Sequence, residues 1–114
     1  MTEIRIIDES HKSDINLPNE PFQLVGKMLP SYVNGQWDHR VQYLPEADVT
    51  EMCFPDENYN FEKMQENSVF IGAYEGDLCV GLAILQDAWF RYMYLYDLKV
   101  SRDYRRKGIS TALL

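Results

Sequence analysis

The sequence predicts an α+β fold with a mixed sheet in which antiparallel strands dominate. Three observations predict it. Short apolar runs separated by turn residues fill residues 69–100, a pattern typical of strands joined by hairpins. A brief alternation of polar and apolar residues over residues 3–8 indicates a first strand. The last strand passes directly into a basic, glycine-containing turn that opens a helix within residues 105–114.

The composition is that of one globular domain. With 114 residues, 46% of them hydrophobic, residues 1–114 are expected to form a single domain with a real core. No apolar run approaches the roughly 18 to 20 residues of a membrane span, and the N-terminus lacks the features of a signal peptide. The net charge of −7 argues against a nucleic-acid binder. These features predict a cytoplasmic protein.

The cysteines and histidines show no metal-ligand spacing. Cys53 and Cys79 lie in unlike contexts without a CxxC pair, so both are expected to be reduced, structural thiols. His11 and His39 are far apart in the sequence. We therefore expect no zinc site.

After the first strand, the first half of the chain is predicted to form a short helix and then a second strand. Asn19 can cap a short amphipathic helix that begins near Pro21 and ends before Pro30. Asn34-Gly35 is a turn signal, and the apolar and aromatic residues from Trp37 to Tyr43 fall on one side of a strand.

The second half carries the stronger pattern. Residues 48–54 and 60–65 are each expected to form one or two helical turns in a flap over the sheet. Residues 69–74 and 78–85 form a hairpin around a turn at 75–77, and residues 92–100 supply the third strand of an antiparallel meander.

The turn after the third strand has the chemistry of a phosphate site. Gly108 has no side chain and lets a ligand approach the backbone, while the first N–H groups of a helix are oriented donors. Three consecutive cations, Arg105, Arg106 and Lys107, add charge that a pyrophosphate would need. A basic surface turn with one glycine is also common without any ligand.

This turn resembles a family motif. The pattern Arg105-x-x-Gly108-x-Ser110, directly after a strand that ends Leu98-x-Val100, resembles the Gln/Arg-x-x-Gly-x-Gly/Ala motif of the GNAT superfamily of acyl-CoA-dependent N-acetyltransferases. Ser110 departs from the usual glycine or alanine. The order strand, helix, flap, hairpin, strand and motif matches the N-terminal half of the GNAT fold over essentially the whole chain. The resemblance implies that half of the fold, ending at the start of the pyrophosphate-binding helix.

Residues 16–22 and 94–100 resemble, more closely, the streptothricin acetyltransferases, which are antibiotic-resistance members of this superfamily. That resemblance implies transfer of an acetyl group from acetyl-CoA to an amine of the β-lysine moiety of a streptothricin. The expected partners are acetyl-CoA and a small cationic amine, without a metal, nucleic acid or a membrane, and a homodimer stays open. A polyamine acceptor and a non-catalytic acyl-CoA-binding role stay open as alternatives.

The family motif also implies where acetyl-CoA binds. The backbone of residues 105–110 would hold the pyrophosphate, and the backbone of the last strand would pair with the pantetheine arm as though it were another strand. The expected cofactor-binding residues are Leu98, Val100, Arg105, Arg106, Lys107, Gly108, Ile109 and Ser110.

Asp97 is the candidate catalytic and substrate-binding residue. A carboxylate among apolar neighbours needs hydrogen bonds, a paired charge or solvent. Asp97 would anchor the cationic amine or help to remove its proton, and a purely structural carboxylate is the alternative. Trp89, at a turn beside the expected cleft, is a candidate for substrate contact. The acidic residues of the flap either attract a cationic substrate or are simply solvated; they are Glu51, Asp56 and Glu57.

The resemblance also implies a missing part. In this superfamily the general acid is commonly a tyrosine downstream of the motif helix, and the strands after that helix form the other wall of the acceptor cleft. The sequence therefore predicts a domain that is incomplete at its C-terminus and inactive by itself.

Overall fold

The computed structural model describes residues 2–114, except for the side chain of Trp89. The chain divides into two compact units, one made of residues 1–20 and 55–114 and the other of residues 21–54. A single domain over residues 1–114 stays a prediction.

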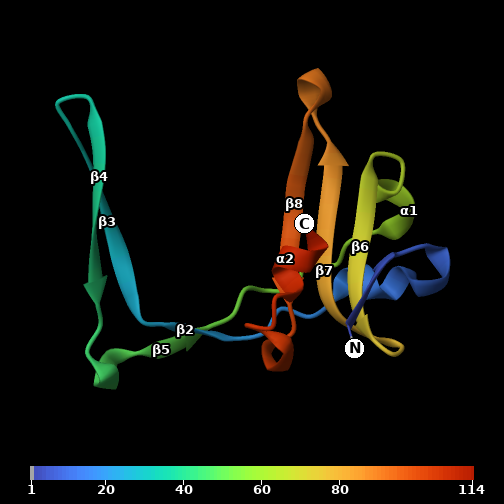
Figure 1. The fold of residues 1–114 in the computed structure, drawn as a ribbon, viewed down its shortest axis with the longest axis horizontal. Coiled ribbons are helices and arrows are strands. Elements are labelled where there is room, and N and C mark those ends of the chain that lie inside the picture. Colours follow the sequence, from blue (N-terminus) through green and yellow to red (C-terminus); the bar gives the residue numbers. More distant parts are fainter. Residues whose placement is uncertain (1) are drawn as a thin grey trace. The chain divides into compact units, whose positions relative to one another are not determined.

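The larger unit is built on a four-stranded sheet in the order β1-β6-β7-β8, and every neighbouring pair is antiparallel (Figure 1). Its strands are β1 (Thr2–Ile6), β6 (Ser68–Glu75), β7 (Leu78–Asp87) and β8 (Met93–Val100). The predicted hairpin, third strand and first strand are all confirmed. Since β6 and β7 are central, their side chains are covered on both faces, which explains their nearly continuous apolar sequence.

Short helices lie between the strands of this unit. They are the 3-10 helices η1 (Glu9–Asn16), η3 (Trp89–Arg91) and η4 (Arg102–Tyr104), and the α-helices α1 (Phe61–Met64) and α2 (Ile109–Leu113). Among them, η1, α1 and α2 pack on the faces of the sheet. Asn60 caps α1 as its side chain accepts a hydrogen bond from the Lys63 backbone N–H at 3.0 Å, which confirms the helical turn predicted over residues 60–65.

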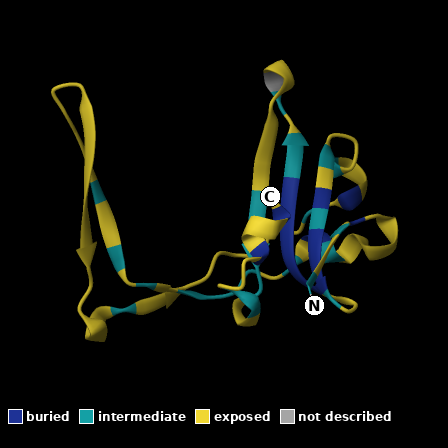
Figure 2. Cartoon of the chain, viewed as in Figure 1, coloured by how far each residue is buried: buried dark blue, intermediate teal, exposed yellow. Residues whose placement is uncertain are grey.

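The core consists of two clusters, and alternate residues of β7 feed them. One cluster lies with η1 and α1 and contains Ile7, Ile15, Phe61, Phe70, Tyr74, Cys79, Leu82 and Ile84. The other lies under α2 and contains Ala73, Val80, Ala83, Ile109 and Leu113. Buried residues gather on β6 and β7 in Figure 2. A Cβ on Gly81 would meet Ile109 at 3.0 Å and Leu113 at 3.2 Å, so this glycine allows α2 to pack closely on the sheet.

The smaller unit contains two antiparallel ribbons. One pairs β2 (Phe22–Leu24) with β5 (Thr50–Met52), and the other pairs β3 (Gly26–Val33) with β4 (Gln36–Tyr43). A short 3-10 helix, η2 (Glu46–Asp48), lies between β4 and β5. Asn34 and Gly35 have φ values of 53° and 75°, as a tight hairpin turn requires, so the predicted turn and the strand after it are confirmed.

Two helix predictions in this unit are wrong. The segment from Pro21 to Leu29 forms β2 and the start of β3 instead of a helix, because Gly26 interrupts a window already too short for a stable helix. The backbone of residues 26–33 hydrogen-bonds instead to β4. Pro30, which has no backbone N–H to donate, is tolerated in this two-stranded ribbon because both of its strands are edge strands. Likewise, residues 50–52 form β5, and the only helical turn nearby within the described chain is η2.

Candidate active site

The turn between β8 and α2 forms a pocket. Arg106 and Gly108 both have left-handed backbones, with φ values of 61° and 78°, and this double reversal brings the start of α2 back beside the end of β8. The pocket has a volume of about 420 Å³ and is lined by Val100, Tyr104, Arg105, Arg106, Gly108, Ile109, Ser110 and Thr111. Most of the predicted cofactor-binding residues therefore meet at one place.

The side chains of this turn have different surroundings. Arg105 donates from Nε to the Val100 carbonyl at 3.1 Å and from Nη2 to the Glu20 carbonyl at 3.3 Å, so its guanidinium ties the turn to the rest of the unit. The Lys107 ammonium lies 5.3 Å from the centre of the Tyr104 ring. Ile109, the first residue of α2, is buried against the sheet, whereas Arg106 and Ser110 are exposed. Any ligand contact of Ile109 would therefore come from its backbone.

The outer edge of β8 presents peptide groups away from the sheet. No strand within residues 2–114 pairs with this edge. The Ser101 N–H donates to the Val80 carbonyl at 2.8 Å, and Val100 is opposite Gly81, which fixes the hydrogen-bonding register. In that register the N–H and C=O groups of Leu98 and Val100 point outward. This orientation is the one that strand-like pairing with an extended ligand requires, although the Val100 carbonyl already accepts from Arg105.

A β-bulge in β8 sets which residues face the other side of the sheet. Ile84 is opposite Asp97 and Leu85 is opposite Leu95, so Tyr96 has no counterpart. As a result two adjacent residues, Tyr96 and Asp97, both contact Tyr59. The Tyr59 and Tyr96 ring centres are 5.8 Å apart, and the Tyr59 hydroxyl donates to Asp97 Oδ2 at 2.9 Å.

Asp97 belongs to a polar network on the face opposite α2. Its side chain is 17% exposed, and its Oδ2 atom lies 3.4 Å from the Lys99 ammonium. Lys99, only 9% exposed, also donates to Glu57 Oε2 at 2.9 Å and to the Leu17 carbonyl at 3.1 Å. The partly buried charges of Asp97 and Lys99 are thus paired and hydrogen-bonded, which offsets the cost of removing them from water.

The network shifts two ionisation equilibria. Partial burial, and then the hydrogen bond to the Asp97 carboxylate, raise the pKa of Tyr59 well above its ordinary value, so the phenol stays protonated. Partial burial also acts to raise the pKa of Glu57, but hydrogen bonds from Asn19 and Lys99 outweigh it and hold that pKa below its ordinary value. Glu57 is therefore a paired carboxylate, although its side chain stays 31% exposed.

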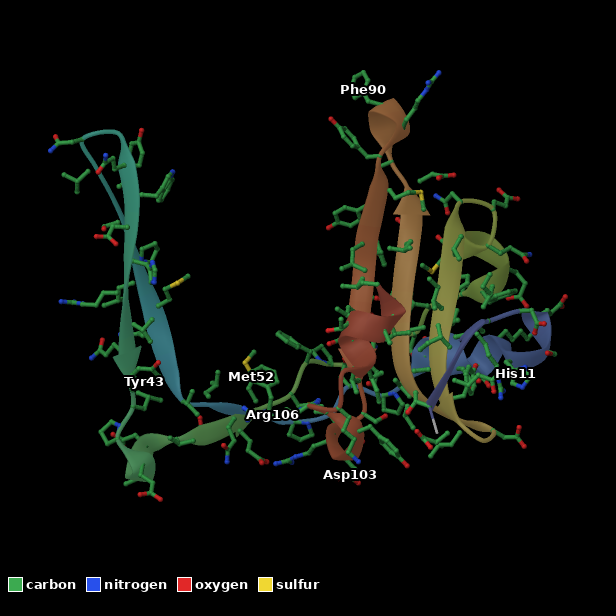
Figure 3. The ribbon with its side chains drawn as sticks, viewed as in Figure 1. His11, Tyr43, Met52, Phe90, Asp103 and Arg106 are labelled. Carbon is green, nitrogen blue, oxygen red and sulfur yellow. The ribbon has the colours of Figure 1, made fainter. Side chains whose placement is uncertain are left out.

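The structure separates the predicted residues into two groups. Leu98 and Val100 pack toward the cluster under α2, and Asp97 lies with Tyr59 on the opposite face. The side chain of Trp89 lies outside the described part of the chain. Its neighbour Phe90 projects from the turn between β7 and β8 and is 84% exposed (Figure 3).

Sequence reasoning missed Tyr59 and Lys99. Lys99 carried a signal, since residues two apart in a strand share a face and Lys99 follows Asp97 by two. Tyr59 carried none, because 38 residues separate it from Asp97 in the chain.

Residues 2–114 contain neither a candidate membrane-spanning helix nor a candidate metal-binding cluster. No helix there is both long and apolar enough to span a membrane. The same residues contain no cluster of three or more histidine, cysteine, aspartate or glutamate side chains that could hold a metal ion.

Comparison with known proteins places this geometry in context. Residues 33–114 match the acetyltransferase (GNAT) family. Streptothricin acetyltransferase A of Bacillus subtilis (strain 168) is 31% identical over 101 residues, which are 89% of this chain and 58% of that protein.

Two solved structures share the fold. One is a Bacillus anthracis (strain Ames) protein assigned as a streptothricin acetyltransferase and solved in complex with acetyl coenzyme A. It has a TM-score of 0.77 and 19% identity, over 99% of this chain and 64% of that one. The other is nourseothricin acetyltransferase, with a TM-score of 0.73 and 18% identity, over 98% of this chain and 61% of that one. The chain spans about three-fifths of the length of each relative.

Proposed function

Because the chain belongs to the acetyltransferase (GNAT) family, we propose that it is an acetyl-CoA-dependent N-acetyltransferase acting on an amine of a cationic small molecule. The leading acceptor is the β-lysine moiety of a streptothricin, which would make the protein an antibiotic-resistance enzyme. The relation to a streptothricin acetyltransferase at 31% identity supports this acceptor.

One observation carries the cofactor part of the proposal. The outward peptide groups of Leu98 and Val100 lead directly into the pocket formed by the turn at residues 105–110. An extended pantetheine arm would pair with these outward peptide groups. The pyrophosphate would lie against the N–H groups and cations of the turn. The Arg105 guanidinium is tied to backbone carbonyls, so Arg106, Lys107 and the Ser110 hydroxyl are the side chains we assign to the pyrophosphate.

The reaction needs a neutral amine next to the thioester. The amine nitrogen would attack the thioester carbonyl carbon, the new N–C bond would form, and the C–S bond would break to release CoA. The amine loses one proton and the departing sulfur gains one. We assign Asp97 to the cationic acceptor, as the carboxylate that anchors it or assists loss of its proton. No tyrosine of this chain is assigned as the general acid.

A two-part experiment tests this function. Isothermal titration calorimetry should show binding of acetyl-CoA. Because residues 1–114 are expected to be inactive by themselves, the thiol-release assay is carried out on the whole protein, where CoA production with streptothricin should exceed that with spermidine or free lysine. A protein that binds no acetyl-CoA would contradict the proposal. Binding without thiol release from any amine would instead support a non-catalytic acyl-CoA-binding protein, and a preference for spermidine would make a polyamine the acceptor.

A further inference from the structure

We propose that Tyr59 and Lys99 are positioning residues for Asp97, which hold its Oδ2 atom and leave Oδ1 to receive the ammonium group of the acceptor. This inference rests on the proposed acetyl transfer. It adds two residues, from segments outside the cofactor motif, to the acceptor side of the reaction.

The first support is the geometry around the Asp97 carboxylate. The Tyr59 hydroxyl at 2.9 Å and the Lys99 ammonium at 3.4 Å both contact Oδ2. Oδ1 has no protein hydrogen bond among residues 2–114. A carboxylate oxygen accepts about two hydrogen bonds, so Oδ1 retains the capacity to accept from a ligand.

The second support is the balance of charge. Lys99 pairs more closely with Glu57, at 2.9 Å, than with Asp97, at 3.4 Å. One cation therefore serves two carboxylates, and the surplus negative charge lies on the Asp97 side. A cationic amine at Oδ1 would neutralise that surplus in a partly buried place where an unpaired charge is costly.

The third support is the rigidity of Tyr59. Asn16 binds both backbone polar groups of Tyr59, since Nδ2 of Asn16 donates to the Tyr59 carbonyl at 2.9 Å and the Tyr59 N–H donates to Asn16 Oδ1 at 2.6 Å. The Tyr59 ring contacts Tyr96 at the bulge and lies 5.9 Å from the Lys99 ammonium. The hydroxyl is thus fixed before any ligand arrives, which is what a positioning group must provide.

The test compares two single-atom changes on tyrosines. Tyr59→Phe removes the hydroxyl that holds Asp97 and keeps the ring, whereas Tyr94→Phe removes a hydroxyl that makes no hydrogen bond to the described part of the chain. Tyr59→Phe should lower kcat/KM for the amine about tenfold, the usual scale for losing a hydrogen bond to a charged group. Acetyl-CoA affinity and the melting temperature should change little, and Tyr94→Phe should leave all three unchanged.

Each other outcome has a distinct meaning. Unchanged kcat/KM in Tyr59→Phe would overturn the inference and leave the proposed function standing, as would an equal loss of acetyl-CoA affinity and stability, which would indicate a merely structural role. If the whole wild-type protein binds no acetyl-CoA, or acetylates no amine, the proposed function and this inference are overturned together.

A second measurement needs no turnover. The Cζ resonance of Tyr59 in protein labelled with ¹³C-tyrosine should move in Asp97→Ala, since the phenol would lose its carboxylate acceptor, while the Tyr94 resonance should not. The charged and titratable groups that face the Tyr59 phenol are Asp97, Lys99 and Tyr96 from β8, and Glu57 from its own segment. An unmoved Tyr59 resonance would show that the hydrogen bond is absent in solution and would overturn the inference.

Discussion

The two faces of the end of β8 carry different chemistry although they come from consecutive residues. Leu98 and Val100 pack toward α2 and present their peptide groups to the outer edge. Asp97 and Lys99 point to the other face, where they join Tyr59 and Glu57 in a network of side chains. One side therefore offers backbone and the other offers charge. Strand alternation separates them, and the bulge at Tyr96 adds a second aromatic contact to the charged side.

The difference indicates which substitutions each side tolerates. A site built from backbone depends on φ and ψ, and side-chain changes at Leu98 or Val100 act on it mainly through packing. A site built from paired charges depends on every member, because each removal leaves a partner uncompensated.

The largest effect is expected from removing the central charge of the network. Lys99→Met keeps the length of the stem but leaves Asp97 and Glu57 without their cation, and should lower the free energy of unfolding by about 2 to 3 kcal/mol. Chemical denaturation measures this change in the free energy of unfolding. Lys12→Met is the matched control, because Lys12 and Glu62 form a 2.8 Å ion pair with both side chains about half exposed. Equal losses in the two variants would mean that burial of the network contributes nothing.

The next effect belongs to the backbone side. Gly108→Val places a β-branched residue at φ 78°, where a Cβ meets no atom within 4 Å, so the cost is backbone strain and not a clash. Acetyl-CoA affinity should fall about 10- to 100-fold, measured by calorimetry.

Gly76→Val is the control for that change. Gly76 also has a positive φ, 62°, and open space around it, but lies in the turn between β6 and β7. It should lower stability without lowering acetyl-CoA affinity. If Gly108→Val bound acetyl-CoA as tightly as Gly76→Val, the turn at residues 105–110 would not be the pyrophosphate site.

The smallest effect is a pH dependence of stability on the charged side. The pKa of Glu57 is lower in the folded protein than its ordinary value of 4.5, so its contribution is present above pH 4.5 and is lost as the pH falls through the lowered pKa. Urea unfolding at pH 7 and pH 3 should show a smaller loss of stability in Glu57→Gln than in the wild type. Glu66→Gln, at an exposed glutamate outside the network, should keep the wild-type loss. If Glu57→Gln lost as much stability between pH 7 and pH 3 as the wild type, ionisation of Glu57 would not contribute to the pH dependence.

The sequence by itself determined the elements whose signals are local. The meander of β6, β7 and β8 follows from apolar runs and turn residues within about thirty positions, and the turn at Asn34-Gly35 follows from two adjacent residues. The resemblance of residues 105–110 to a family motif likewise needed only neighbouring residues and the strand before them.

Only the tertiary structure decided the rest. The segment from Pro21 to Leu29 became strands because its backbone pairs with residues far along the chain, which no local propensity encodes. Asp97 became part of a network because Tyr59 contacts it and Glu57 contacts Lys99, each across about forty residues, and because a bulge turns Tyr96 toward the same face. Periodicity reports which face a residue occupies, whereas the partner on that face is set by how distant segments pack.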